Sequence, residues 1–307
     1  MFNNGSCMIF GIVAGVLSAL FQSGSYALSR AFMLKHKSRL NLLFYSQLAM
    51  GALGILTLPL ILPVVRFPWS GAFWGLMAGW FFAFVIGQFS FFQALREIEA
   101  SRLSSLFGLK IVVLAVIFIA VEQRNLNFLQ WIAVVLSAVA AMGMNLTGGR
   151  LSLKGLAWLA LTLVSYSACD IVETGMIKMM PGKSVMLESL GIVALSYALL
   201  GFCTLPVLAL KNDHRRLLID AVPFSVAWYG AMIFIYVCFG LIGVVFGNII
   251  QASRGIISVA LGAVLLHYGF DRLEPRVGRK AWIRRFLMAV VMLAAMCLYT
   301  YARNRMQ

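Results

Sequence analysis

The sequence has 307 residues, of which 62% are hydrophobic and only 11% are charged, and its mean hydropathy is +0.93. Soluble globular domains carry about 25% charged residues because their surfaces face water, so this composition excludes a water-soluble protein. The formal net charge of +15 comes from 25 Lys and Arg against 10 Asp and Glu. These bases gather in short gaps between long apolar segments. That pattern is typical of membrane topology signals and argues against a nucleic-acid partner.

Apolar segments long enough to cross a bilayer follow one another along the whole chain. A membrane-spanning helix needs about 20 mostly apolar residues, and these segments are continuous rather than alternating, which favours helices over a β-barrel. The sequence therefore predicts an all-α, polytopic membrane protein of ten transmembrane helices, without a soluble domain. The predicted spans are Met8–Ser29, Leu40–Val65, Gly71–Leu95, Leu103–Val121, Phe128–Leu146, Leu153–Val172, Met186–Leu210, Phe224–Leu241, Ile249–Tyr268 and Ala281–Tyr301.

Small residues recur at helical spacing in two of these spans. Glycines at such spacing let the backbones of neighbouring helices approach closely in lipid. The sequence therefore predicts tight helix packing at Gly11 and Gly15, and at Gly71, Gly75 and Gly79.

The two halves of the chain share a short pattern at a constant offset. Ala100–Arg102 and Ala252–Arg254 have the same Ala-Ser-Arg sequence 152 residues apart, and Glu122 and Glu274 are separated by the same offset. This pattern predicts a duplication within one transmembrane domain. Each copy holds five spans, an odd number, so the second copy enters the membrane from the opposite side. The result is a pair of inverted five-helix repeats, residues 1–150 and 151–307, with a substrate site between them.

These segments resemble the two repeat signatures of EamA-type proteins in the drug/metabolite transporter superfamily. The first signature is Gln93–Arg102, running on to Glu122, and the second is Asn248–Ser258, ending at Glu274. The resemblance covers essentially the whole chain. It implies a ten-helix carrier that moves a small metabolite through a central cavity lined by both repeats. Two positions depart from the family pattern: Lys110 lies where many relatives have an apolar residue or a proline, and Arg254 lies deep enough to contact a ligand.

The bases are distributed unequally between the two ends of the predicted spans. The gaps after spans one, three, five, seven and nine hold 17 Lys and Arg, whereas the other gaps and the C-terminal tail hold 6; Lys110 and Arg254 fall within spans. Under the positive-inside rule the odd-numbered gaps are cytoplasmic and both termini lie outside. The resemblance implies cytoplasmic termini, so the charge distribution predicts the opposite orientation.

Ionisable side chains within the spans are the first candidates for a functional site, because they are costly in lipid. Arg254 could bind a carboxylate or phosphate, snorkel to the interface, or pair structurally with Asp170 or Glu173. Lys110 must face water, a partner or the substrate. Asp170 and Glu173 share one helix face and could carry a coupling proton, balance a base, or mark the membrane boundary.

Aromatic and amide side chains within the spans complete the candidate substrate-binding set. A small-molecule pocket needs a few convergent polar groups, although each of these side chains could instead serve in helix packing. Trp80 lies in the middle of its span, away from the interfacial belt that Trp prefers. The additional candidates are Tyr26, Gln47, Trp80, Gln88, Tyr166 and Asn248.

The sequence predicts a secondary transporter that moves a small polar metabolite, with an anion favoured by the two bases, by alternating access. The alternatives are a flippase for a lipid or lipid-linked sugar and, with less support, an integral-membrane transferase. We expect no enzymatic activity, no cofactor and no metal, because the histidines His36, His214 and His267 lie in or near different gaps. The expected partners are a small-molecule substrate and the bilayer, no nucleic acid is expected, and the expected location is the cell (inner) membrane. No feature of the sequence indicates which oligomeric state the protein adopts.

Overall fold

The computed structural model describes residues 4–98, 103, 106–122, 127–145, 152–182, 184–210, 214–251, 253–268 and 278–304. Within these ranges the chain is helical and contains no strand, which confirms the all-α prediction. The helices are α1 (Asn4–His36), α2 (Arg39–Ile61), α3 (Gly71–Glu97), η1 (Phe107–Leu109), α5 (Lys110–Glu122), α6 (Phe128–Asn145), α7 (Leu153–Met179), α8 (Val185–Thr204), η2 (Leu205–Leu210), α9 (His214–Ile242), α10 (Val244–Gln251), α11 (Arg254–His267) and α12 (Arg279–Asn304).

Each of the ten predicted spans coincides with a helix in the described ranges. By length and composition, seven described segments can cross a membrane: α1, α2, α3, α7, α8, α9 and Val244–Val264, which joins α10 to α11. Shorter apolar helices lie within α6 and α12. Many large apolar side chains point outward, such as Leu60 at 77% and Phe82 at 66% exposure. Lipid is the solvent that suits such a surface, and the protein is an integral, multi-pass membrane protein.

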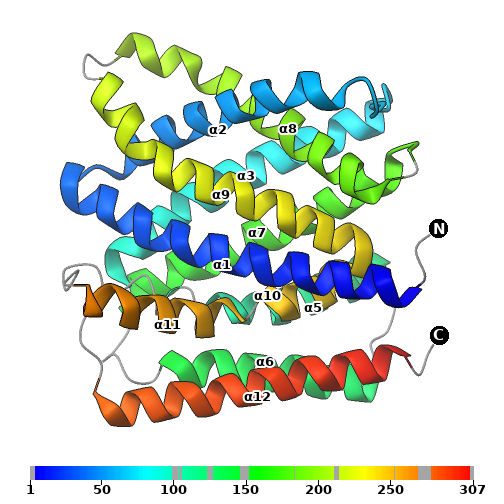
Figure 1. Cartoon of the computed structure of the whole chain (residues 1–307), viewed down its shortest axis with the longest axis vertical. Helices are drawn as coiled ribbons and strands as arrows, with labels where there is room; N and C mark the ends of the chain where they lie inside the picture. The colour runs from blue at the N-terminus through cyan, green and yellow to red at the C-terminus, as the bar shows by residue number, and fades with distance from the viewer. Residues whose placement is uncertain are drawn as a thin grey trace.

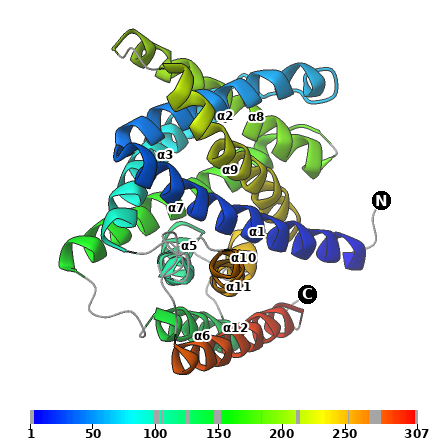
Figure 2. The same cartoon turned by 60° about the vertical axis from the view of Figure 1, so that its left-hand side comes forward.

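The helices run back and forth along one direction, and both termini lie at the same end of the bundle (Figure 1). Helix α1 packs most extensively on α9, α3 on α7, α2 on α8, and α6 on α12. Helices α5, α10 and α11 lie between the α6–α12 pair and the rest of the bundle (Figure 2). Each of the four pairs joins a helix from the first half of the chain to one from the second half.

The α1–α9 pair is joined by polar contacts at two levels. Near the middle, the Ser18 hydroxyl donates to the carbonyl oxygen of Ala231 at 2.7 Å. At the end where α1 stops, Lys35 and His36 both contact the Asp220 carboxylate of α9 at 2.7 Å. These contacts add to the apolar packing between the two helices.

Serine residues define where several helices begin. Each lies at the N-cap with extended backbone, and its hydroxyl accepts a hydrogen bond from the backbone N–H three residues later. This contact satisfies one of the N–H groups that a helix start leaves without a partner. The capping serines are Ser38, Ser70, Ser152 and Ser184.

Two predicted spans are interrupted, which the sequence did not indicate. The fourth begins with the short 3-10 turn η1 before α5 starts at Lys110. The ninth begins earlier than predicted, at Val244, and breaks after Gln251, so that α11 starts at Arg254. Apolar sequences give no signal for such breaks, and lipid-embedded chains tolerate them only where the freed backbone groups face protein or a cavity.

The boundary of the sixth span was predicted too early. Helix α7 continues past both acids to Met179. Asp170 and Glu173 are buried inside the bundle, at 6% and 3% exposure. Their burial favours the interpretation that these acids balance a base or carry a proton over the interpretation that they mark the membrane boundary.

The glycine prediction is confirmed for α1 and wrong for α3. A Cβ on Gly11 would come within 2.5 Å of the Ile242 side chain. Gly15 is similarly close to Ile250, at 2.8 Å. The α3 glycines have nothing within 4 Å of such a Cβ and lie on the exposed face of the helix, so they make no close approach: Gly71, Gly75 and Gly79.

The tightest approach of two backbones occurs instead between α2 and α8. A Cβ on Gly51 would overlap the Cα of Gly201, and a Cβ on Gly54 would come 2.6 Å from the carbonyl oxygen of Ala194.

The predicted duplication pairs Arg102 with Arg254 and Glu122 with Glu274. Of these residues, Arg102 and Glu274 lie outside the described residues.

We expect the Gly51→Ala variant to lower the melting temperature, because the new methyl group must push α2 and α8 apart. Gly79→Ala is the matched control: it adds the same methyl on an exposed helix face, where Ala is about 1 kcal/mol better than Gly in a helix interior. Thermal unfolding in one detergent compares the two. Equal melting temperatures would contradict the assigned α2–α8 contact.

Candidate functional site

A small cavity lies near the centre of the bundle, where α1, α3, α7 and α9 meet α5, α10 and α11. Its volume is about 30 Å³, which is room for about two water molecules. Both halves of the chain contribute to its wall. The lining residues are Gln22, Phe84, Phe107, Lys110, Tyr166, Cys169, Asp170, Glu173, Trp228, Met232, Ile235, Phe239, Asn248, Gln251 and Arg254.

A buried ion pair joins α5 to α7 across the cavity wall. The Lys110 ammonium lies 2.6 Å from Oδ2 of Asp170, and the two residues are 8% and 6% exposed. The side-chain amide of Asn248, on α10, donates to the same carboxylate oxygen at 2.6 Å. The three helices therefore meet at one carboxylate, and Lys110 acquires an acidic partner that is absent within one turn along its own helix.

The second acid is held differently. The indole N–H of Trp80 donates to Oε1 of Glu173 at 2.7 Å, and Trp80 stacks on Phe84 with ring centroids 4.8 Å apart. Glu173 forms no ion pair within 4 Å in the described part of the chain. A carboxylate without a cation is costly to bury, so Glu173 depends on hydrogen-bond donors such as Trp80 for stabilisation.

Arg254 lies at the break between α10 and α11 and is 4% exposed. Its Nη1 donates to the Gln22 side-chain oxygen and, at 3.4 Å, to the Tyr26 hydroxyl. Its guanidinium also lies over the Phe107 ring, 5.0 Å from the centroid. The two cavity acids are engaged elsewhere, by Lys110 and by Trp80, so the structural pairing of Arg254 with either acid does not occur.

Aromatic rings pack in and behind the cavity wall toward the end of the bundle where α1 stops and α9 starts. The ring centroids of Tyr26 and Phe91 are 4.9 Å apart, and the ring centroid of Tyr166 lies 6.0 Å from those of Phe107 and Trp228. Tyr26 follows Gln22 along α1, and Phe91 follows Phe84 along α3, so this layer lies beyond the cavity in that direction. The aromatic layer therefore separates the cavity from the end of the bundle where most bases gather.

The structure brings most of the predicted site residues together. Tyr26 and Trp80 stand just behind the wall, each bonded to a residue that lines it, whereas Gln47 and Gln88 do not line the cavity. Both glutamines are nonetheless buried, at 2% and 0% exposure, without a hydrogen-bond partner among the described residues. The predicted residues that line the cavity are Lys110, Tyr166, Asn248, Arg254, Asp170 and Glu173.

Sequence reasoning missed the apolar part of the wall. Side chains such as Phe84, Phe107, Met232 and Phe239 resemble dozens of other apolar residues in the spans, so nothing in their type or spacing marks them. Cys169 lies in the wall as well. Among the described residues, no group of three or more His, Cys, Asp or Glu could hold a metal ion.

We expect Lys110→Met to destabilise the protein by about 3–5 kcal/mol, because it leaves the Asp170 carboxylate buried without its cation. The double variant Lys110→Met/Asp170→Asn should recover much of that loss, since the orphaned charge is then absent. Lys154→Met, at an exposed lysine, is the control. Additive losses in the double variant, measured by thermal unfolding, would argue against the ion pair.

Comparison with known proteins agrees with this geometry. Residues 9–146 match the model of the EamA-like transporter family, and no curated protein matches the sequence. Among solved structures 28 chains match. One of them, titled "Crystal structure of protein", aligns over 99% of this chain and 100% of its own, with a TM-score of 0.65 and 13% identity. That likeness shows the fold alone, whereas the family match indicates a membrane transporter. The resemblance found in the sequence is thus confirmed over residues 9–146, which match a transporter family of the drug/metabolite transporter superfamily.

Proposed function

We propose that the protein is a secondary transporter that moves a small anionic metabolite through the central cavity by alternating access. The observation that carries the proposal is Arg254, a buried arginine in the cavity wall at a helix break. Discontinuous helices near the membrane centre are typical of substrate sites in secondary transporters. The planar guanidinium suits two-point binding of a carboxylate or phosphate.

The packing of the helices supports an inverted repeat of residues 1–150 and 151–307. A two-fold axis would exchange span one with six, two with seven, three with eight, four with nine and five with ten. It would then map the α1–α9 contact onto α7–α3, and would map α2–α8 and α6–α12 onto themselves. These are the four most extensive helix pairs in the bundle, and two related arrangements of such repeats are what alternating access requires.

The charges around the cavity support coupling of the anion to a proton. Two basic and two acidic residues line it: Lys110, Arg254, Asp170 and Glu173. When all are charged they sum to zero, and when Glu173 binds a proton they sum to +1, which an anion neutralises. Proton and anion thus bind together more favourably than either binds alone, and neither a catalytic group nor a cofactor is needed. The proposal places the carrier in the cell (inner) membrane.

Transport and stability measured together on Arg254 variants test the proposal. In liposomes, a panel of small carboxylates and phosphates, with neutral and cationic analogues, first identifies a substrate. Arg254→Ala should then lose at least about 100-fold in anion uptake, as when an interaction worth about 3 kcal/mol is removed. Arg254→Lys should recover only part, because the two-point geometry is lost.

Arg66→Ala is the matched control. Arg66 is exposed and does not line the cavity, so this variant should transport normally. Full transport by a stable Arg254→Ala protein would contradict the anion site. A wild-type protein that moves only neutral or cationic members of the panel would do the same.

Glu173→Gln separates proton coupling from binding, because glutamine resembles the protonated acid and keeps a partner for Trp80 at a position that no longer titrates. We expect this variant to exchange labelled for unlabelled anion at the wild-type rate while failing to accumulate it when a pH gradient is imposed. Accumulation at the wild-type level would show that Glu173 does not carry the coupling proton.

A further inference from the structure

A second pocket, about 420 Å³ in volume, lies at the end of the bundle where α1 stops, α2 starts and α3 stops. This volume falls in the range of about 300–1,000 Å³ that is typical of small-molecule sites. The tight turn from α1 to α2 passes through Lys37, whose φ is +52°. The pocket is separate from the central cavity, with which it shares no lining residue.

Positive charge dominates this pocket. Four bases line it (Arg30, Lys37, Arg39 and Arg96) against one acid, Glu97, which leaves a net charge of +3. None of the four bases forms an ion pair with another described residue.

The neighbouring base Lys35 differs, because it is paired with Asp220. An excess of bases at one end of a membrane protein sets its orientation in the membrane. It does not require four of those bases to line a single pocket, as they do here.

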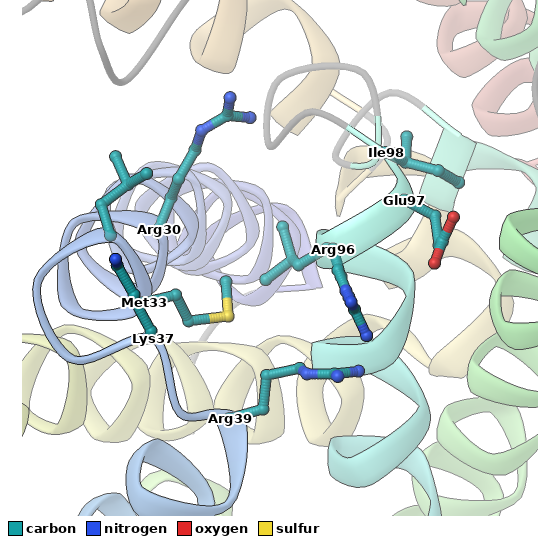
Figure 3. A pocket seen from close by; sticks show the side chains of 9 residues that line it. Arg30, Met33, Lys37, Arg39, Arg96, Glu97 and Ile98 are labelled. Atoms are coloured by element: carbon teal, nitrogen blue, oxygen red, sulfur yellow. The ribbon is translucent and has the colours of Figure 1, made fainter.

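The two arginines at the pocket repel each other in the absence of an anion. Arg39 at the start of α2 and Arg96 at the end of α3 extend toward one another (Figure 3), and the charge of Arg96 acts on Arg39. The Glu97 carboxylate, which also acts on Arg39, accepts a hydrogen bond from Ser152 at 3.4 Å. A phosphate group between the two guanidinium groups would relieve the repulsion and accept hydrogen bonds from both.

The rest of the lining is apolar, which decides between a soluble anion and a lipid. Met33, Leu34, Leu95 and Ile98 share the pocket with the bases, and Leu34 is 50% exposed on the outer face of α1. A soluble phosphate gains no favourable contact from these apolar side chains. An anionic lipid has a charged head group and apolar acyl chains, so it can contact basic and apolar side chains that lie together at a helix end. Basic pockets between transmembrane helices on the cytoplasmic side commonly hold anionic head groups.

We infer that this pocket binds the phosphate head group of an anionic membrane lipid, with Arg39 and Arg96 on the phosphate and Leu34 beside an acyl chain. The site is independent of the proposed transport site, because none of its residues contacts the central cavity. It joins the ends of three helices, so an occupied pocket holds the α1–α2 turn against α3.

The test compares phosphatidylglycerol with phosphatidylcholine of identical acyl chains, added to the full-length protein in neutral detergent. Native mass spectrometry measures lipid retention, and thermal unfolding measures stabilisation. The wild type should retain one phosphatidylglycerol in preference to phosphatidylcholine. Arg39→Gln/Arg96→Gln should weaken that affinity by about 25-fold, at about fivefold for each base.

Arg215→Gln/Arg216→Gln is the matched control, since it removes two exposed bases from the same end of the bundle but outside the pocket. It should retain the lipid as the wild type does. The single variant Arg96→Gln changes one exposed residue and should weaken binding about fivefold even if the double variant folds poorly.

Three results would overturn the inference. The first is equal retention of the two lipids by the wild type. The second is equal loss of phosphatidylglycerol in the pocket variants and the control. The third is full displacement of phosphatidylglycerol by millimolar inorganic phosphate, which would identify a site for a soluble anion instead.

Discussion

The cost of holding charge inside a membrane shapes the centre of this protein. Lys110 and Asp170 are both buried, 2.6 Å apart, and Asn248 donates to the same carboxylate. Either charge alone would be expensive in a low-dielectric interior, so each requires the other. The contact ties α5 of the first half to α7 and α10 of the second. The position of the two interrupted spans, and hence of the cavity between them, depends on it.

The remaining charges at the cavity follow from the same constraint. Asp170 pairs with Lys110, whereas Arg254 donates to Gln22 and Tyr26, and Glu173 accepts from the Trp80 indole. A lysine–acid pair is a stable arrangement by itself. Arg254 and Glu173 lie in the same cavity wall but outside this pair, so the part of the site that holds the helices together differs from the part that we propose for binding.

Sequence reasoning predicted the membrane class, the ten spans and the intramembrane charges, because hydropathy and charge are read directly from residue type. It also placed Arg254 and Lys110 as exceptional positions. It could not predict which base pairs with Asp170, since that depends on which helices become neighbours. The breaks near Lys110 and Arg254 were missed, because apolar segments look alike whether or not they are interrupted. Gln47 and Gln88 show the reverse error: polar type suggested a cavity position, whereas packing placed them elsewhere in the interior.

The α1–α9 contact has a mechanical consequence. The two helices are joined near the middle by Ser18 and Ala231, and at one end by Lys35, His36 and Asp220. Two connections well separated along a helix resist both sliding and splaying, so α1 and α9 behave as one lever. A unit that moves as α1 and α9 together therefore differs from the two halves of the sequence, because it takes one helix from each half. In the proposed cycle, a unit made of α1 and α9 would cross the boundary between the two proposed repeats, residues 1–150 and 151–307.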